Sequence, residues 1–149
     1  MGAPPSVLVV GAGAVGQVFA HHLQRGGARV TFFVRDRHLA EVARGFDLVR
    51  LYAFGRRAPA RLDGCDALGT AQEVARGRYD HAFLTVPSNG LRGPWLAEFV
   101  RALCDATLVA TVASPDDREA VLAAGAVPER LVDGLLSPAR LLCAVDRSS

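Results

Sequence analysis

The sequence predicts an α/β fold in which a mainly parallel sheet is doubly wound, with helices on both of its faces. Two observations lead to this prediction. Short apolar runs typical of buried strands alternate with segments of helical periodicity, and the links between them are short. The first of these runs is joined to the helix after it by three closely spaced glycines, in the stretch VLVVGAGAVG. Such an alternation is typical of βαβ units in a parallel sheet.

The first strand and the first helix follow directly from the residue pattern. Ser6–Val10 is a continuous apolar and β-branched run, which suits a strand buried on both faces of a parallel sheet. From Ala14 to Gln24 the apolar residues recur with the period of an amphipathic helix, and Gly26 and Gly27 provide its stop. The apolar stripe of this helix is Val15, Val18, Phe19 and Leu23.

The same alternation continues along the chain. Runs rich in β-branched and aromatic residues predict three further strands, at Ala28–Val34, Asp80–Val86 and Thr107–Ala113. Helical patterns predict helices at Asp36–Arg44, Thr70–Arg76 and Leu91–Cys104, and another that begins at Ser114. Ser114 is expected to be an N-cap, because proline follows it and an acidic residue stands three positions later.

One segment interrupts this regular pattern, and one further strand follows the last helix. Between Phe46 and Leu62, two short runs flank the stretch FGRR at 54–57, which predicts either a hairpin or an irregular excursion. Leu131–Leu136 is expected to be a fifth strand. We take residues 1–136 as one domain, and we expect residues 137–149 to be a C-terminal tail or the truncated start of a missing helical domain.

Composition excludes several classes of function. The chain has 149 residues and a formal net charge of +2, and its arginines are scattered, so no nucleic acid partner is expected. No apolar run approaches the roughly 18 residues of a membrane span, and we expect a cytoplasmic protein. The three cysteines form no C-x-x-C pair, and the adjacent His21 and His22 point in different directions on a helix, so no metal site is expected.

The glycines of the first turn have the spacing of a dinucleotide-binding motif. Gly11 would make the tight turn, Gly13 would admit the pyrophosphate, and Gly16 would let the helix pack against the strand. The phosphate would then meet the backbone N–H groups of the turn formed by Gly11, Ala12, Gly13, Ala14, Val15 and Gly16. The domain 1–136 is therefore interpreted as a Rossmann-like dinucleotide-binding domain, the alternative being a strand–helix turn without a ligand.

Arg35 distinguishes between the possible dinucleotides. An acidic residue about 20 positions beyond the glycines would bind an unphosphorylated ribose. This chain instead has Arg35 after the second strand, and its guanidinium suits a 2′-phosphate, with Arg37 as a second contact. NADP(H) is thus favoured over NAD(H) or FAD. The alternative is a solvated Arg35 that pairs with Asp36, and His38 lies near the same place.

The stretch VLVVGAGAVGQVFAHHLQRGGARVTFFVRDRHL closely resembles the opening of the ketopantoate reductase family. The resemblance continues less tightly through Asp80–Val86 and through residues 108–122. It implies an N-terminal NADP-binding domain of an NADPH-dependent oxidoreductase that reduces a 2-keto acid, with a helical second domain supplying a lysine as general acid. We also expect Val86, at the end of the Asp80–Val86 strand, and Pro87, directly after it, to contact the cofactor.

The chain departs from the family pattern on the substrate side. No lysine occurs anywhere in the sequence, and Pro87 stands where the family usually carries one. Ser114 and Pro115 replace an asparagine–glycine pair of the family. Ser88 and Asn89 could bind a substrate or the nicotinamide ribose, although such a sequence after a strand is commonly a turn.

These features leave two main hypotheses for the function, besides the remote one of a Rossmann-like fold that binds no nucleotide. In the first, the chain is the cofactor-binding part of a reductase of 2-keto acids, inactive by itself and with unassigned catalytic residues. In the second, it is a non-catalytic NADP(H)-binding sensor or interaction module. A homodimer is left open in both.

Overall fold

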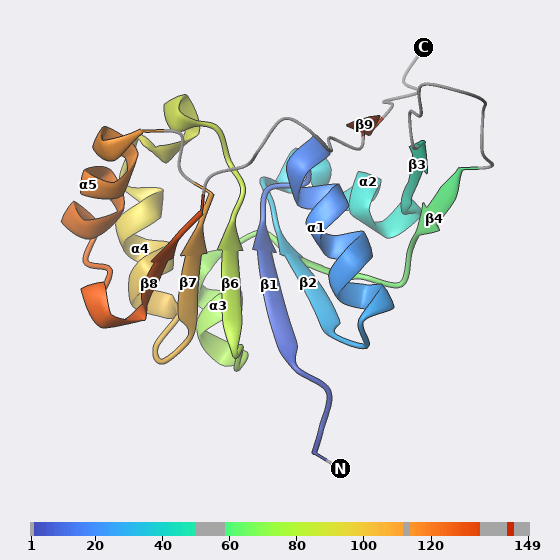
Figure 1. Cartoon of the computed structure of the whole chain (residues 1–149), viewed down its shortest axis with the longest axis horizontal. Helices are drawn as coiled ribbons and strands as arrows, with labels where there is room; N and C mark the ends of the chain where they lie inside the picture. Colours follow the sequence, from blue (N-terminus) through green and yellow to red (C-terminus); the bar gives the residue numbers. More distant parts are fainter. Residues whose placement is uncertain (1, 50–58, 112–113, 135–142, 145–149) are drawn as a thin grey trace.

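Six strands form the central sheet of the computed structural model, which describes residues 2–49, 59–111, 114–134 and 143–144. They are β1 (Ser6–Val10), β2 (Arg29–Phe33), β5 (Asp66–Leu68), β6 (His81–Leu84), β7 (Thr107–Ala110) and β8 (Leu131–Asp133). Their order in space is β5-β2-β1-β6-β7-β8, and every neighbouring pair is parallel (Figure 1). This is the strand order of a doubly wound Rossmann-like fold, as the sequence predicted.

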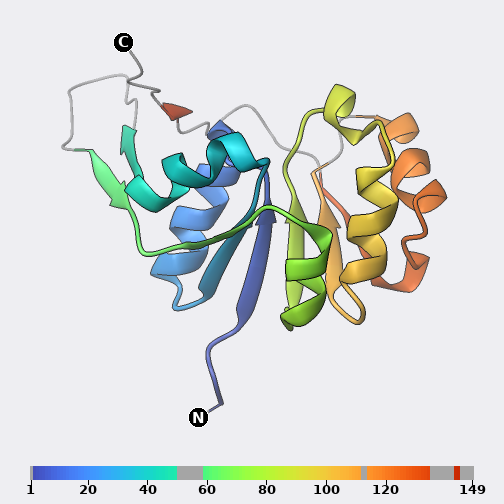
Figure 2. The ribbon, with the colours of Figure 1, turned by 180° about the vertical axis from the view of Figure 1, so that it is seen from behind.

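Helices cover both faces of the sheet, because its strands bury alternate residues on each side. Helix α1 (Ala14–Arg25) lies on one face, and α3 (Ala71–Arg76) and α4 (Trp95–Ala102) lie on the other (Figures 1 and 2). The remaining helical segments are α2 (Leu39–Arg44), α5 (Pro115–Ala123) and the 3₁₀ turns η1 (Asp36–His38), η2 (Ser88–Leu91) and η3 (Pro128–Arg130). Leu8 packs with Phe99 of α4 in one buried cluster, whereas Val9 belongs to the cluster that contains Ala20 of α1.

A second, smaller sheet lies beside the first. It contains β3 (Phe46–Val49), β4 (Ala60–Leu62) and β9 (Cys143–Ala144), with β3 pairing antiparallel with both of the others. The pairing of β3 with β4 favours the hairpin interpretation of Phe46–Leu62, although the FGRR stretch at 54–57 lies outside the described residues. Strand β9 was not predicted, and it falls within the segment 137–149 that was expected to be a tail or the truncated start of a helical domain.

Several predicted boundaries are wrong. The helix expected from Leu91 starts only at Trp95, because η2 and Gly93 (φ +103°) come before it. It ends at Ala102 and is soon followed by Cys104, which has a φ of +53°. Strand β5 was missed, since three residues are too short to show a period.

Other predicted elements are shorter in the structure than the sequence indicated. The strand predicted at Ala28–Val34 is limited to β2, and the helix predicted from Asp36 begins as the 3₁₀ turn η1. The predicted ends of the strands at 107–113 and 131–136 include residues outside the described part of the chain.

Helix α3 begins with a capping box. The Thr70 hydroxyl accepts a hydrogen bond from the Glu73 backbone N–H, and the Glu73 carboxylate accepts one from the Thr70 N–H. Backbone N–H groups of Gly69 and Thr70, together with the Thr70 hydroxyl, hold the pKa of Glu73 below its ordinary value. The capping box therefore explains why the helix predicted at Thr70–Arg76 forms there.

Three aromatic rings pack behind the end of β2. The rings of Phe33 and Phe99 stack at 5.0 Å, and the Trp95 ring lies 6.1 Å from Phe99 and 6.4 Å from Phe33. The Trp95 indole N–H is also held, because it donates to the carbonyl of Gly90 at 3.0 Å. This aromatic cluster ties α4 to the strand end that leads to Arg35.

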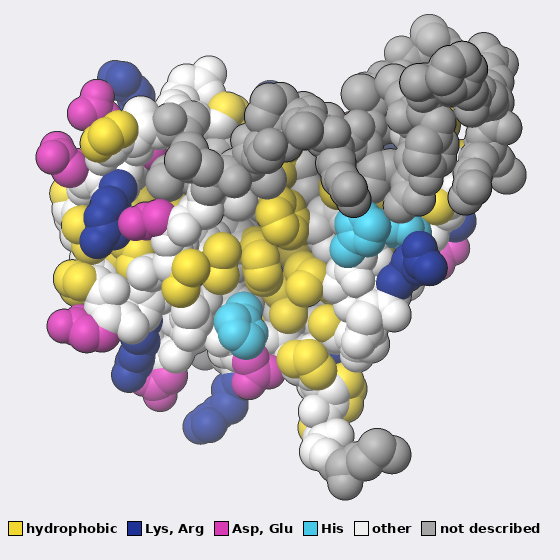
Figure 3. All heavy atoms as spheres, viewed as in Figure 1, with side chains coloured by type: hydrophobic (Ala, Val, Ile, Leu, Met, Phe, Trp, Pro, Cys, Tyr) yellow, Lys and Arg dark blue, Asp and Glu magenta, His cyan; other side chains and the backbone are white. Residues whose placement is uncertain are grey.

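Apolar side chains gather on the face of the sheet beside α1 (Figure 3). Phe83, Val109 and Val132 are register partners across β6, β7 and β8, so they share one face of the sheet. Phe83 contacts Phe19 of α1 with ring centroids 5.3 Å apart, and Val132 is 50 % exposed. No helix in the described part of the chain is both long and apolar enough to cross a membrane.

Candidate functional site

The predicted cofactor residues meet at one edge of the sheet. Strands β1, β2 and β6 are adjacent and parallel, so their carboxyl ends open at the same side. The glycine turn follows β1, Arg35 follows β2, and Val86 and Pro87 follow β6. The winding of the sheet reverses between β1 and β6, and ligands of such sheets bind in the crevice outside that point.

Gly11 makes the tight turn predicted for it. Its φ is +93°, a conformation that favours glycine, and its N–H donates to the Phe33 carbonyl at 2.9 Å. A Cβ at this position would lie 3.1 Å from Cγ1 of Val86. Gly11 thus brings the turn against both β2 and the end of β6.

Gly16 lets α1 pack against the turn, as predicted. It is buried, and a Cβ here would overlap the Gly11 carbonyl oxygen and lie 2.9 Å from Oγ1 of Thr85. The obstruction is backbone, which cannot rotate away. The first turn of α1 and the end of β1 can approach this closely only because residue 16 has no side chain.

Gly13 stands in open space at the start of α1. A Cβ built on it would have no heavy atom within 4 Å, and no side chain caps the helix at this residue. The exposed Ala14 and the half-buried Val15 open the first turn, and the Ala12 carbonyl accepts a hydrogen bond from Nε2 of Gln17 at 2.8 Å. The Gln17 side chain therefore holds the turn at Ala12, while the space beside Gly13 stays open in the described structure.

Thr85 is a supporting residue whose role was not predicted from the sequence. Its hydroxyl donates to the Val10 carbonyl at 2.6 Å and lies 3.3 Å from the Gly11 carbonyl oxygen. Its backbone N–H also donates to the Val10 carbonyl, at 3.1 Å. A threonine directly after the apolar run AFL is the only signal that the sequence offered for this role.

Replacing Thr85 by valine tests this support. We expect Thr85→Val to lower the free energy of unfolding by about 1 kcal/mol, since it removes the hydroxyl but leaves the backbone bond to Val10. We also expect NADPH to bind about threefold more weakly, because the Gly11 carbonyl loses its hydroxyl contact. Urea denaturation and calorimetric titration measure the two effects.

Thr111 offers a matched control for that variant. Its hydroxyl and its N–H both donate to the Leu84 carbonyl, at 2.8 and 3.2 Å, in the same arrangement one strand further along the sheet. Thr111→Val should cost similar stability and leave NADPH affinity unchanged. Equal losses of affinity in the two variants would contradict a specific role for Thr85.

Arg35 lies on the solvent side of the same edge. Its backbone is extended and the residue is exposed. Within the described residues, no hydrogen bond or ion pair holds its guanidinium. The described structure does not show the alternative pairing with Asp36, whose carboxylate instead lies against Gly69. The arginine predicted to read a 2′-phosphate therefore has no described anionic partner.

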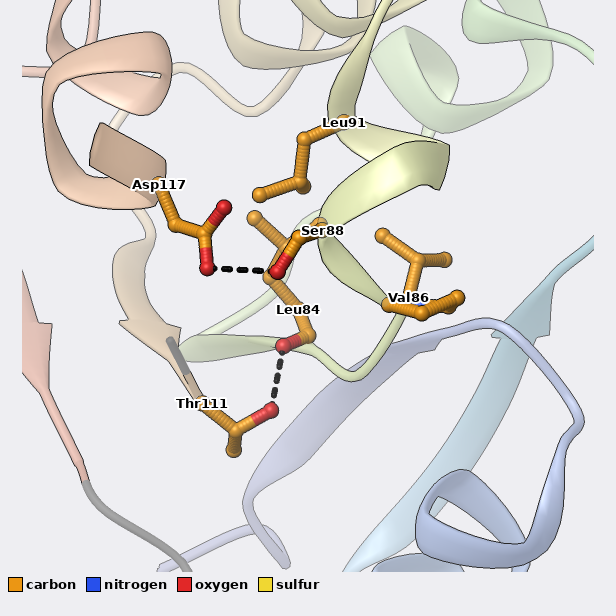
Figure 4. A pocket seen from close by; sticks show the side chains of 7 residues that line it. Leu84, Val86, Ser88, Leu91, Thr111 and Asp117 are labelled. Atoms are coloured by element: carbon orange, nitrogen blue, oxygen red, sulfur yellow. Dashed lines mark hydrogen bonds between the residues drawn. The ribbon is translucent and has the colours of Figure 1, made fainter. Parts of the chain in front are cut away.

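Val86 and Pro87 follow β6 at the same edge of the sheet. Val86 lies beside Gly11, and the exposed Pro87 precedes η2. Behind them is a cavity of about 50 Å³, which has room for water but not for a dinucleotide (Figure 4). It is lined by Leu84, Val86, Pro87, Ser88, Leu91, Thr111 and Asp117.

The polar groups of this cavity bind each other. The Ser88 hydroxyl donates to the Asp117 carboxylate at 2.7 Å, which joins η2 to α5, and Asp117 is only 6 % exposed (Figure 4). Ser114 accepts a hydrogen bond from the Asp117 N–H at 3.3 Å, so its predicted role as the N-cap of α5 is confirmed. The Ser88 hydroxyl, for which a substrate contact and a plain turn were both considered above, is thus engaged by a residue 29 positions away.

The histidines do not form a shared site in the described structure. The rings of His21 and His22 lie edge to face at 5.4 Å, and His81 is exposed at the start of β6. Across the ranges that the structure describes, no group of three or more His, Cys, Asp or Glu is suited to a metal ion. His38 differs from the others, because it binds Arg37 and Glu41 beside Arg35.

Comparisons with known proteins agree on the fold. The family model described as ketopantoate reductase PanE/ApbA matches residues 7–112. No curated protein was found to match the sequence.

Among solved structures, a 2-dehydropantoate 2-reductase from Geobacter metallireducens GS-15 is similar at 22 % identity and a TM-score of 0.67, over 87 % of this chain and 40 % of that one. A PanE/ApbA family ketopantoate reductase from Ralstonia eutropha JMP134 has 17 % identity and a TM-score of 0.64, over 86 % and 39 % of the two chains. A D-mandelate dehydrogenase solved with NADH and anilino(oxo)acetate has 15 % identity and a TM-score of 0.62, over 87 % and 40 %. The chain therefore spans about two fifths of the length of these structures.

Proposed function

The chain belongs to the ketopantoate reductase PanE/ApbA family, and from that membership we propose that it is the NADP(H)-binding domain of an oxidoreductase that reduces a 2-keto acid. One observation carries the proposal. An arginine without a described partner stands at the same sheet edge as a glycine turn that has open space beside Gly13 and no side-chain cap on the helix after it.

The residues of the turn fit a dinucleotide. Gly13 leaves open the space that a side chain would fill, and the uncapped first turn of α1 offers N–H donors and a positive helix end to a pyrophosphate. Gly11, Ala12, Gly13, Ala14, Val15 and Gly16 would hold the pyrophosphate, and Val86 and Pro87 would line the side toward the nicotinamide. The bound cofactor would supply the hydride for a reduction.

Arg35 favours NADP(H) over NAD(H). A guanidinium binds a phosphate dianion through two charge-assisted hydrogen bonds, whereas an unphosphorylated ribose gives it no charge to bind. The D-mandelate dehydrogenase of similar fold was solved with NADH, so the fold alone does not decide between the two dinucleotides. The choice depends on the residue that follows β2.

The chemistry of the substrate side argues that these residues do not turn over a 2-keto acid by themselves. Hydride transfer to a ketone builds negative charge on its oxygen, which needs a proton donor or a cation. The sequence has no lysine, and the Ser88 hydroxyl donates to the Asp117 carboxylate. The catalytic donor remains unassigned in this proposal.

A non-catalytic NADP(H)-binding sensor or interaction module is the second candidate. The hydrogen bond between Ser88 and Asp117 favours it, because this bond engages the hydroxyl that could otherwise bind a substrate. Turnover measurements distinguish the two candidates.

Calorimetric titration of the chain with NADPH and with NADH tests the cofactor. We expect NADPH to bind about tenfold or more tightly than NADH, since only NADPH offers Arg35 a phosphate. Absence of binding for both at high micromolar concentration would end the cofactor proposal. Tighter binding of NADH would end the role given to Arg35.

Following NADPH oxidation in the presence of a panel of 2-keto acids then tests catalysis. We expect no oxidation by this chain alone. Turnover would overturn the conclusion that a donor is missing and would also exclude the non-catalytic module.

A further inference from the structure

The turn after β2 contains a chain of three side chains that the glycine motif and Arg35 do not explain. Arg37 Nε donates to His38 Nε2 at 3.0 Å, and His38 Nδ1 lies 3.0 Å from Oε2 of Glu41. The side chains of His38 and Glu41 are 37 % and 46 % exposed. Arg37 is exposed, and it follows Arg35 by two residues.

The contacts define the protonation of the imidazole. A guanidinium is only a donor, so His38 Nε2 must accept and carries no proton. The ring proton is then on Nδ1, where it is donated to the Glu41 carboxylate. His38 therefore acts here as a neutral bridge with one accepting and one donating nitrogen.

This bridge keeps Arg37 from pairing directly with Glu41. The two residues are four positions apart, a spacing at which opposite charges on a helical segment attract each other. With His38 between them, only Nε of Arg37 is bound in the described structure, and its two terminal nitrogens remain available. Those two nitrogens form the pair of donors that a phosphate accepts.

We propose that His38 is a positioning residue for the 2′-phosphate of NADP(H). It holds Arg37 as the second guanidinium beside Arg35, and it keeps Glu41 from pairing with Arg37. The inference rests on the proposed function, since it requires that the edge binds a phosphorylated ribose. The preference for NADPH over NADH then depends on a histidine that does not itself contact the phosphate. Asp36 does not oppose this arrangement, because its carboxylate lies against Gly69.

Two substitutions at position 38 test the bridge in the full chain. His38→Leu removes both hydrogen bonds and frees Glu41 to attract Arg37, so we expect NADPH to bind about fivefold more weakly and NADH to bind as before. His38→Gln is the conservative control, because its amide oxygen can accept from Arg37 while its amide nitrogen donates to Glu41. It should restore most of the NADPH affinity.

A double-mutant cycle shows whether His38 acts through Arg37. Arg37→Ala should weaken NADPH binding about tenfold, and adding His38→Leu to it should cause no further loss. A merely structural role would instead weaken NADPH and NADH alike and would lower the melting temperature of His38→Leu. Additive losses, an unchanged affinity in His38→Leu, or failure of His38→Gln to restore binding would each overturn the proposal.

The outcomes separate this inference from the proposed function. If the unmodified chain binds neither dinucleotide, both are wrong. If it prefers NADPH and depends on Arg35 while His38→Leu binds normally, only the positioning role of His38 is wrong.

Discussion

Gly16→Ala is expected to destabilise the protein by about 3 kcal/mol or more, a large part of the free energy of unfolding of a domain of this size. The added methyl group would overlap the Gly11 carbonyl oxygen and press on the Thr85 hydroxyl. Relief requires α1 to move away from β1, which would also open the turn that Gly11 forms. Thermal or urea denaturation measures the loss, and NADPH affinity should fall with it.

Gly13→Ala is the matched control for this variant. It adds the same methyl group three residues earlier, where no residue beyond its chain neighbours comes within 4 Å and the backbone φ of −73° suits alanine. Its stability should be unchanged, yet its NADPH affinity should fall, because the methyl group would occupy the space proposed for the pyrophosphate. A stable Gly16→Ala variant would contradict the close packing, and a Gly13→Ala variant with normal NADPH affinity would contradict the proposed pyrophosphate position.

Arg35→Glu is expected to lower NADPH affinity about a hundredfold or more while leaving NADH affinity nearly unchanged. The substitution removes a charge-assisted hydrogen-bond donor and places a carboxylate next to the 2′-phosphate, where like charges repel. Because the ribose hydroxyl of NADH carries no charge, the preference between the two dinucleotides should be reversed. Calorimetric titration with both ligands measures the ratio.

Arg29→Glu controls for the change in net charge. Arg29 is also exposed on β2, but it lies at the amino end of the strand, opposite the candidate site. Its substitution alters the overall charge equally and should weaken NADPH binding only slightly, an effect that salt screens. Similar losses in both variants would show that Arg35 acts only through the general field of the protein.

The sequence predicted best those parts of the fold whose signals are local. Ser6–Val10 was placed with its observed bounds, and α1 within one residue, because the switch from a continuous apolar run to a helical period is contained in the residues themselves. The roles of Gly11 and Gly16 were predicted for the same reason. The spacing of the glycines indicates that the first makes the tight turn after the strand and that the last allows the helix to pack against it.

What the sequence did not reveal depends on partners distant in the chain. Strand β5 is three residues long and exists because it pairs with β2, and β9 pairs with β3 from nearly a hundred positions away. The Thr85 hydroxyl acts on carbonyls 74 and 75 positions earlier. Such contacts leave no periodic trace in the sequence, so they become visible only in the folded chain.

The hydrogen bond between Ser88 and Asp117 shows that the prediction of function has the same limit. Its sequence context, PSNG after a strand, permitted a substrate contact or a plain turn. The fold brings Asp117 to it from α5, and this neighbour decides what the hydroxyl can do. The sequence therefore predicted that Ser88 lies near the candidate site, but it did not predict that the Ser88 hydroxyl is already bound to Asp117.

The aromatic cluster behind β2 also gives the protein an internal optical reporter. Trp95 is the single tryptophan of the chain, so all indole fluorescence comes from one half-buried place in the fold. Its ring neighbours Phe33, whose carbonyl accepts the N–H of Gly11 at the start of the glycine turn. Emission from this chain is therefore a single-site signal that needs no added label, and its source is separated from the glycine turn by one residue, Phe33.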